Sequence, residues 1–297
     1  MSIHSELLTI RDFIRYAVTS FNNAPLYYGH GTDNAWDEAI VLVFHSLHIP
    51  HQNQEIMLDA RLTQDEKNKL ADLIQKRIAD HVPVPYLTHE AWFAGLSFYV
   101  DERVLIPRSP IAELIEAQFQ PWINEEDVNN ILDLCTGSGC IAIACAKVFE
   151  HAEVDASDIS KDALAVAKIN TLRHDVCDQV HLIESDLFKN IPKKKYDIIV
   201  TNPPYVSTQE ISDLPKEYLH EPQHALKAGS EGLDIAIKIL KQAREYLSPH
   251  GILVLEVGNS ETALMERYPD APFTWLEFER GGGGVMLIGA EELGRLM

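Results

Sequence analysis

The chain contains Ile131-Leu132-Asp133-Leu134-Cys135-Thr136-Gly137-Ser138-Gly139-Cys140, an apolar strand pattern that leads directly into a turn with two glycines. Glycine is required where the backbone turns tightly and where a ligand must approach it closely. The continuation to Ala142 also fits a dinucleotide-binding pattern, so the turn alone does not distinguish between cofactors. It predicts a site for a nucleotide-like cofactor at the carboxyl end of a strand.

From residue 130 onward, strand and helix patterns alternate along the chain. Such alternation implies a parallel sheet with helices on both faces. Near the end, four glycines from Gly281 to Gly284 separate two strand patterns, which predicts a hairpin and an antiparallel strand in the sheet. The expected strands are Ile131–Leu134, Ala152–Ser157, Val180–Glu184, Tyr196–Thr201, Gly251–Val257, Thr274–Glu279 and Val285–Ile288, and the expected helices are Gly139–Phe149, Lys161–Arg173 and Leu233–Leu247.

The residues before position 86 show helical periodicity and predict a small helical domain, residues 1–85. The first of three amphipathic helices carries Ile3, Leu7, Ile10, Ile14, Ala17 and Phe21 on one face, and the second carries Trp36, Ile40, Val43 and Leu47. The third opens with the capping box Thr63-Gln64-Asp65-Glu66 and ends near His81, because Pro83 and Pro85 follow. A β-hairpin linker is expected over residues 86–107, and the main domain over residues 108–297, where Ser109-Pro110 starts a helix.

Composition and charge limit the function classes. Hydrophobic residues make up 46% and charged residues 24%, which is typical of a soluble globular protein. We find no apolar run that could span a bilayer and no export signal, so we expect a cytoplasmic protein without a membrane partner. The four cysteines match no zinc spacing, and we expect small buried residues and no metal site. These cysteines are Cys135, Cys140, Cys145 and Cys177.

The net charge of −20 results from 45 acidic and 25 basic residues. Such a surface repels a polyanion and attracts a basic partner, although acidity that only keeps the protein soluble is an alternative. The charge therefore argues against nucleic-acid phosphates as the main docking surface.

Three carboxylates lie near expected strand ends, and two of them, Asp133 and Asp186, favour S-adenosylmethionine as the cofactor. Asp133 would face any pyrophosphate, which disfavours NAD but suits the ammonium group of S-adenosylmethionine. Asp158 ends the second strand. A carboxylate at this position can accept hydrogen bonds from both ribose hydroxyls, in NAD as well as in S-adenosylmethionine. The alternative role of Asp158 is to cap the next helix. Asp186 would lie beside the adenine, with a strand-end cap as its alternative role.

The tetrapeptide Asn202-Pro203-Pro204-Tyr205 follows the fourth strand, at the edge of the sheet where ligands bind in such folds. The Asn202 side-chain oxygen and the Pro203 carbonyl can each accept one N–H of an NH₂ group and hold its weakly nucleophilic nitrogen in line with the methyl–sulfur bond. Pro203 and Pro204 stiffen the loop, and the Tyr205 ring can lie against a flat acceptor. An ordinary turn is the alternative. The long segment from Tyr205 to Leu233 is expected to form a lid or binding loop.

These residues, together with Val104-Leu105-Ile106-Pro107-Arg108, resemble the protein-glutamine methyltransferases over nearly the whole chain. The resemblance implies an α/β fold, in which a small helical substrate-recognition domain precedes a Rossmann-like class I methyltransferase domain that depends on S-adenosylmethionine. The sheet of that domain is expected to be mostly parallel and seven-stranded, with a C-terminal antiparallel hairpin. Cys135 replaces the family's first cofactor glycine. The implied cofactor contacts are Thr136, Gly137, Gly139, Asp158 and Asn202, and the implied acceptor contacts run from Asn202 to Tyr205.

Two bacterial branches of this family differ in their substrate. One methylates the Gly-Gly-Gln loop of peptide-chain release factors, and the other a glutamine of large-subunit ribosomal protein L-three. Ser109–Ile115 after Arg108, and Phe273–Phe278 before the glycine run, resemble the ribosomal branch; the release-factor branch usually has Pro-Asp-Thr-Glu after the arginine. The implied partner is therefore a basic ribosomal protein, before or during its assembly, which suits the acidic charge.

Three other readings of the site remain open. The first is methylation of release factors. The second is methylation of adenine in nucleic acid, which requires an electropositive groove and a way to flip the base, and we expect no sequence-specific nucleic acid partner. The third is a protein that binds the cofactor without activity.

Overall fold

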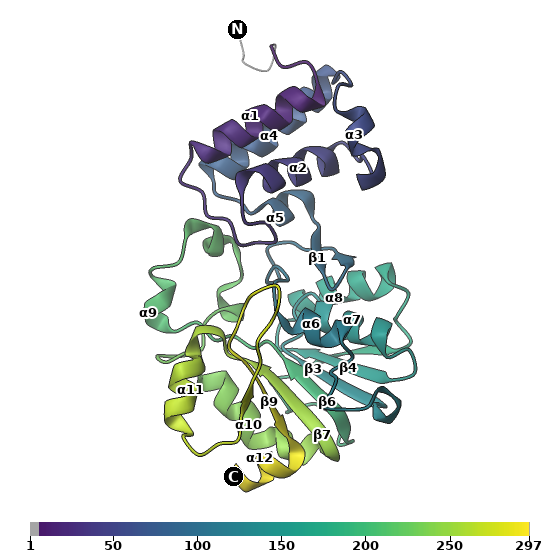
Figure 1. The fold of residues 1–297 in the computed structure, drawn as a ribbon, viewed down its shortest axis with the longest axis vertical. Helices are drawn as coiled ribbons and strands as arrows, with labels where there is room; N and C mark the ends of the chain where they lie inside the picture. Colours follow the sequence, from purple (N-terminus) through teal and green to yellow (C-terminus); the bar gives the residue numbers. More distant parts are fainter. Residues whose placement is uncertain (1–5, 297) are drawn as a thin grey trace. The chain divides into compact units, whose positions relative to one another are not determined.

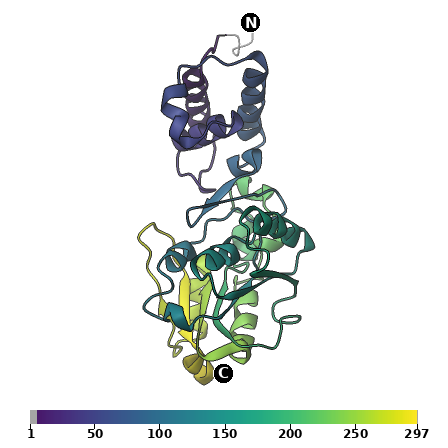
Figure 2. The same cartoon turned by 90° about the vertical axis from the view of Figure 1, so that its right-hand side faces the viewer.

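The computed structural model describes residues 6–296. The chain forms two compact units (Figures 1 and 2). The first unit also includes a short segment that comes much later in the sequence. The first unit contains the residues up to Ala91 together with Pro215–His220, and the second contains Trp92–Leu214 and the residues from Glu221 onward. A segment of the long connection after Tyr205 thus belongs to the helical unit. Among the described residues, no helix combines the length and apolar character needed to cross a membrane.

The second unit is built on a seven-stranded sheet with the order β5-β4-β3-β6-β7-β9-β8. The strands from β3 to β7 pair in parallel, whereas β9 runs antiparallel to both β7 and β8. The predicted parallel sheet and its C-terminal antiparallel hairpin are therefore confirmed. The strands are β3 (Asn130–Leu134), β4 (Glu153–Asp158), β5 (Val180–Glu184), β6 (Tyr196–Thr201), β7 (Leu247–Glu256), β8 (Thr274–Trp275) and β9 (Val285–Gly289).

Helices cover both faces of this sheet (Figure 1). Ile131 and Leu132, successive residues of β3, belong to different buried clusters because side chains alternate along a strand. The cluster with Ile131 includes side chains of α6 and α7, and the cluster with Leu132 includes side chains of α10, α11 and α12. The helices are α6 (Ile111–Glu116), α7 (Cys140–Val148), α8 (Lys161–Arg173), α10 (Asp234–Tyr246), α11 (Glu261–Arg267) and α12 (Ala290–Leu296).

The strand order reverses beside β3, the first strand of the sheet along the chain. From β3 the chain continues to β4 and β5 on one side and then to β6 and β7 on the other. Because the parallel strands end at the same edge, loops on the two sides of such a switch point separate and leave a crevice. The glycine turn after β3 and the Asn202–Tyr205 loop after β6 therefore meet at the place where this class of sheet binds ligands.

Strand β8 is shorter than the predicted range Thr274–Glu279. The Leu276 amide still donates to the Val285 carbonyl of β9 at 3.0 Å, but the amide groups of Glu279 and Arg280 both donate to the carboxylate of Glu113 in α6, each at 2.9 Å. The Glu113 carboxylate of α6 thus accepts hydrogen bonds from amides that would pair with a neighbouring strand if β8 were longer. A strand pattern in the sequence cannot reveal such a contact with a different element.

The helical unit packs α1 (Ile10–Asn22), α2 (Ala35–Ser46) and α4 (Gln64–Ala79) around one buried cluster. The three predicted helices and the capping box of Thr63 and Glu66 are confirmed. The first helix begins later than its apolar pattern suggests, since Thr9 and Asp12 form a second capping box. Leu7 is buried but precedes the helix, and Ile3 lies outside the described residues. Shorter elements are η2 (His51–Asn53), α3 (Gln54–Met57) and α5 (Val84–Thr88).

The predicted hairpin consists of β1 (Ala91–Phe93) and β2 (Leu96–Phe98). Ala94 and Gly95 form its turn, with φ values of +47° and +72°, as a tight two-residue turn requires. The hairpin is shorter than the expected 86–107, because residues 84–88 form α5 and no strand follows Phe98 before residue 108. The remaining short elements are η3 (Glu125–Asp127), α9 (Thr208–Ile211), η4 (Lys216–His220), η5 (Gln223–Ala225) and η6 (Gly258–Ser260).

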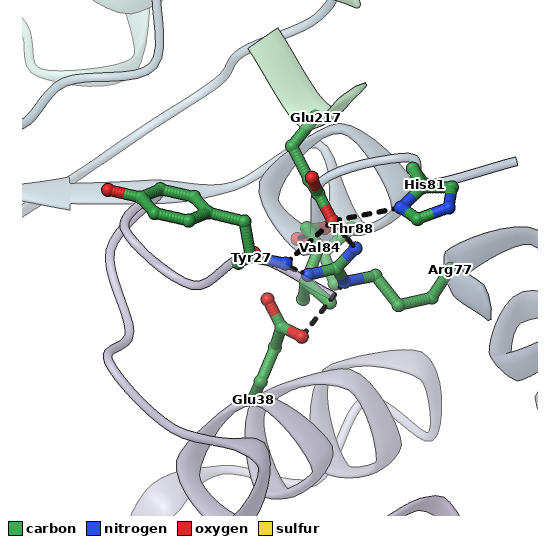
Figure 3. Close-up of polar contacts among 7 residues, drawn as sticks. All are labelled: Tyr27, Glu38, Arg77, His81, Val84, Thr88 and Glu217. Atoms are coloured by element: carbon green, nitrogen blue, oxygen red, sulfur yellow. Dashed lines mark hydrogen bonds and ion pairs between the residues drawn. The ribbon is translucent and has the colours of Figure 1, made fainter. Parts of the chain in front are cut away.

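A buried arginine joins the Pro215–His220 segment to the other residues of the helical unit (Figure 3). Arg77 is 1% exposed, and its Nε donates to Glu38 at 2.9 Å while Nη1 donates to Glu217 at 2.8 Å. Its Nη2 donates to the Tyr27 carbonyl at 2.8 Å. Burial raises the pKa of Glu38. Burial also acts to raise the pKa of Glu217, but hydrogen bonds from Arg77 and the Tyr27 amide outweigh it and lower that pKa.

Candidate active site

The turn between β3 and α7 combines two glycines with different surroundings. Gly137, with φ of +54°, lines a cavity, and nothing lies within 4 Å of a Cβ atom placed on it. Gly139, with φ of +81°, has no such room, because a Cβ atom there would lie 3.2 Å from Ala167 of α8. Gly137 therefore leaves space for a ligand to approach the backbone, whereas Gly139 allows α7 to pack closely on α8.

Cys135 has a left-handed backbone in the same turn, with φ of +60°. Cys135 lines the cavity and is partly exposed. Cys177 is partly exposed as well, so the expectation that all four cysteines are buried is wrong for these two. A cavity at the turn explains the exposure of Cys135. Cys140 and Cys145 are buried within α7, and all four thiols are free.

The cavity lies at the carboxyl ends of four parallel strands. Gly137 follows β3, Asp158 ends β4, and Asp186 follows β5; Asn202 and Pro204 follow β6. Five of the residues selected from the sequence are thus brought together. The apolar part of the lining includes Leu105, Ile159, Ala163, Leu187, Ala225 and Ile235.

Asp158 faces the cavity and is tied to the glycine turn. Its Oδ2 accepts a hydrogen bond from the Gly137 amide at 2.9 Å, and its Oδ1 accepts one from the Ser160 amide at 2.9 Å. The cap of helix α8 is Ser160, whose hydroxyl oxygen accepts from the Ala163 amide at 3.2 Å. Burial raises the pKa of Asp158. Asp158 is thus not itself the helix cap, and its carboxylate is held where a ligand hydroxyl can reach it.

Asp133 lies beneath the turn and not on the cavity wall. Its Oδ2 accepts from the Thr136 hydroxyl at 2.5 Å and from the Ala142 amide at 3.1 Å. Burial raises its pKa to about 7, and within residues 6–296 its Oδ1 has no hydrogen-bond partner. A positive charge nearby would stabilise the ionised form of such a carboxyl group. Thr136 and Asp133 therefore fit a cationic ligand group at the turn without lining the cavity.

The Asn202–Tyr205 loop divides between the cavity and the protein interior. Asn202 and Pro204 line the cavity, whereas Pro203 is buried. The Tyr205 carbonyl accepts from the Ser260 hydroxyl at 3.1 Å. The Tyr205 ring covers Gly258 so closely that a Cβ atom there would lie 2.5 Å from Cε2 of the ring. The loop is therefore held by buried Pro203 between the cavity-facing residues and by Tyr205 directly after them.

Sequence reasoning missed Glu256, the last residue of β7. It is 4% exposed, and the Ser109 hydroxyl donates to it at 2.5 Å. Burial raises the pKa of Glu256, while side-chain hydrogen bonds with Ser109, Tyr205 and Asn202 act to lower it. A carboxylate at the end of the otherwise apolar run Ile252–Leu255 was the available signal in the sequence.

Arg108 of the Ile-Pro-Arg segment holds the connection after the acceptor loop. Its Nη1 and Nη2 donate to the two oxygens of Glu221 at 2.6 and 2.8 Å. Glu221 is 2% exposed and also accepts from the Ile106 amide at 3.0 Å. Two parallel bonds from a guanidinium group fix the geometry as well as the charge. The segment that carries much of the family resemblance therefore has a structural task in this unit.

Residues 118–233 match the family described as the Methyltransferase small domain. The catalytic domain of hMettl16, solved in complex with MAT2A 3′UTR hairpin 6, has the same type of fold. It aligns with a TM-score of 0.50 and 17% identity over 76% of this chain and 81% of that one, which concerns the fold alone. The fold is accordingly that of a Rossmann-like class I methyltransferase.

Two curated relatives define the family more narrowly. The ribosomal protein uL3 glutamine methyltransferase of Francisella tularensis subsp. tularensis is 49% identical over 98% of this chain and 93% of its own length. The protein of the same name from Xanthomonas campestris pv. campestris is 51% identical over 97% of this chain and 93% of its own length. The chain belongs to the family of ribosomal protein uL3 glutamine methyltransferases, as the sequence motifs predicted.

Proposed function

We propose that this chain transfers the methyl group of S-adenosylmethionine to the side-chain amide nitrogen of a glutamine in ribosomal protein uL3. The observation that carries the proposal is that Asn202 shares one cavity with Gly137 and Asp158. A cofactor held by the glycine turn would therefore lie next to an amide held by Asn202. The family relatives supply the identity of the acceptor protein.

The residues of the turn fit S-adenosylmethionine. Asp158 would accept hydrogen bonds from the ribose hydroxyls, and Asp186 lies on the cavity wall where the adenine would bind. The unpartnered oxygen of buried Asp133 fits the positive charge of the ammonium group. Thr136 keeps that carboxyl group in place, and Gly139 allows the turn to close against α8. The bound cofactor supplies a methyl group already activated by its sulfonium, so the chain needs no nucleophilic side chain.

The acceptor loop would orient the amide. The Asn202 side-chain oxygen and the Pro203 carbonyl would each accept one N–H of the glutamine NH₂ group, and Pro204 and the Tyr205 ring would limit its movement. Methyl transfer places positive charge on the nitrogen, and two fixed acceptor oxygens favour that charge. The buried position of Pro203 and the packing of Tyr205 on Gly258 keep these groups in place before the substrate arrives.

Charge suggests how the partner is recognised. A net charge of −20 favours encounter with a basic ribosomal protein and disfavours sequence-specific binding to nucleic acid. Binding before or during assembly in the cytoplasm, when the basic surface of uL3 is not yet covered by RNA, suits this charge. The helical unit and the connection after Tyr205 are the parts that we assign to recognition of uL3.

Replacing Asp158 with alanine should weaken binding of S-adenosylmethionine by about 10- to 100-fold, because two hydrogen bonds to a charged acceptor are lost. Isothermal titration calorimetry with the cofactor measures this change. The control is Glu153→Ala at the opposite end of β4, where the side chain is exposed. An unchanged dissociation constant in Asp158→Ala would exclude the ribose role.

The proposed reaction is tested by the intact masses of purified proteins. Ribosomal protein uL3 and a release factor, both from a strain that lacks this gene, are each incubated with the enzyme and S-adenosylmethionine, and adenine-containing DNA is incubated as a third candidate. We expect uL3 alone to gain one methyl group, and fragmentation should place it on a glutamine. Methylation of only the release factor would contradict the assigned substrate. Methylation of adenine-containing DNA with neither protein changed would contradict the assigned acceptor chemistry.

A further inference from the structure

Asn202 and Glu256 are neighbours because of the register of two parallel strands. Thr201, the last residue of β6, pairs with Leu255 of β7. Asn202 is the first residue after β6, and Glu256 is the last residue of β7, so each directly follows this pair. Residues at the same level of adjacent parallel strands direct their side chains to the same face. The residue that lines the cavity therefore has a carboxylate beside it, although 54 positions separate the two in the sequence.

The carboxylate of Glu256 is surrounded by hydrogen-bond donors. It is 4% exposed. The Ser109 oxygen already accepts from the Ile111 amide at 3.2 Å, so its hydroxyl proton is free to point to Glu256 at 2.5 Å. Side-chain hydrogen bonding with Tyr205 and Asn202, together with the charge of Arg108, acts to lower the pKa of Glu256 against the effect of burial. As a carboxylate, Glu256 can therefore act as a common acceptor for the side chains around the acceptor loop.

The direction of the hydrogen bond decides how the Asn202 amide is oriented. An ionised carboxylate only accepts hydrogen bonds, whereas an asparagine side chain has one donor end and one acceptor end. The NH₂ end of Asn202 must therefore face Glu256, which leaves its oxygen for the cavity. With the amide reversed, the Asn202 oxygen would face a carboxylate and its NH₂ group would face the NH₂ group of the substrate.

The geometry points to Glu256 as a positioning residue that turns the Asn202 oxygen toward the substrate amide and fixes the Tyr205 hydroxyl. This inference rests on the proposed acceptor role of Asn202. Glu256 does not line the cavity, and it acts through Asn202, which does, and through Tyr205 beside it. Gly258 completes the arrangement, since the Tyr205 ring occupies the space that a side chain there would fill.

The test uses Glu256→Gln, Asn202→Asp and the double variant that combines them. The amide that Glu256→Gln introduces can donate to the Asn202 oxygen and reverse the asparagine, so kcat for uL3 should fall by about 10- to 100-fold. Asn202→Asp places two carboxylates side by side and should lose at least as much. In the double variant the new amide can donate to one oxygen of the new carboxylate, which leaves the other oxygen for the substrate. The kcat of the double variant should therefore exceed that of Asn202→Asp.

The readouts separate positioning from a structural role. In Glu256→Gln, KM for uL3 and the dissociation constant for S-adenosylmethionine should stay within about twofold of the native values. The control Glu266→Gln, at an exposed position of α11, should likewise leave both constants within about twofold. Native kcat in Glu256→Gln overturns the inference, and so does a double variant no faster than Asn202→Asp. If Asn202→Ala also keeps native kcat, the proposed acceptor role fails; if Asn202→Ala is slow while Glu256→Gln is native, only the role of Glu256 fails.

Discussion

Replacing Asn202 with alanine should lower kcat for uL3 by about a hundredfold or more, because one preorganised acceptor of the substrate amide is lost. Asn202 lies on the cavity wall directly after β6, where the neighbouring strands hold the backbone on both sides. The substitution removes the side-chain amide without disturbing these strand pairs. Mass spectrometry of uL3 at timed intervals, under saturating cofactor, measures kcat.

Cofactor binding should change much less than turnover in this variant. The ribose and ammonium contacts that we propose belong to Asp158 and the glycine turn, which Asn202→Ala leaves intact. The matched control is Asn124→Ala, at an exposed asparagine outside the cavity lining. Turnover that survives in Asn202→Ala would show that another group holds the amide nitrogen. An equal loss of cofactor affinity and turnover would instead make Asn202 a cofactor ligand alone.

The sheet and the meeting of the two loops could be predicted because both follow from local patterns and one general rule. Apolar runs separated by helical periodicity define parallel strands, and parallel strands end at a common edge. Gly137, Asp158 and Asn202 stand at such ends and share the cavity. Their proximity therefore needed no knowledge of side-chain packing.

Contacts between side chains distant in sequence could not be predicted in the same way. Glu256 becomes a partner of Asn202 only when β7 pairs with β6, and the sequence shows no more than an acid at the end of an apolar run. For Asp133, the sequence could not show that Thr136 and Ala142 both donate to its Oδ2, so that only its Oδ1 is left for the ammonium group that we propose. Helix α1 begins at Ile10 because Thr9 forms its N-terminal capping box, although the apolar spacing extends back to Leu7.

Arg77→Met should destabilise the protein by about 3–5 kcal/mol, because it leaves two buried carboxylates without their cation. Glu38 and Glu217 are 2% and 1% exposed, and Arg77 bonds to both. Methionine retains much of the side-chain volume, so lost packing contributes little to the effect. Urea unfolding of the full chain at neutral pH, followed by circular dichroism, measures the free energy of unfolding.

The pH dependence of this loss identifies its electrostatic origin. Without Arg77, burial raises the folded-state pKa of both glutamates above the unfolded value. A raised carboxyl pKa destabilises the folded protein above that pKa, and the penalty disappears as pH falls toward the unfolded value. The difference between Arg77→Met and the native protein should therefore shrink on acidification, while the exposed-pair variant Arg11→Met should leave the unfolding midpoint unchanged at every pH.

A second substitution should recover part of the stability lost in Arg77→Met. Adding Glu217→Gln removes one of the two uncompensated charges while the amide can still accept from the Tyr27 backbone, whose N–H donates to Glu217 at 3.0 Å. Through Arg77, Glu217 also joins Pro215–His220 to the rest of the helical unit, alongside the contact of the His220 ring with the Asp80 carbonyl at 2.8 Å. In the native background, Glu217→Gln should therefore increase hydrogen exchange of residues 215–220 before it affects the helices. Exchange at native rates in that segment, or no recovery in the double variant, would mean that packing and not charge holds it in place.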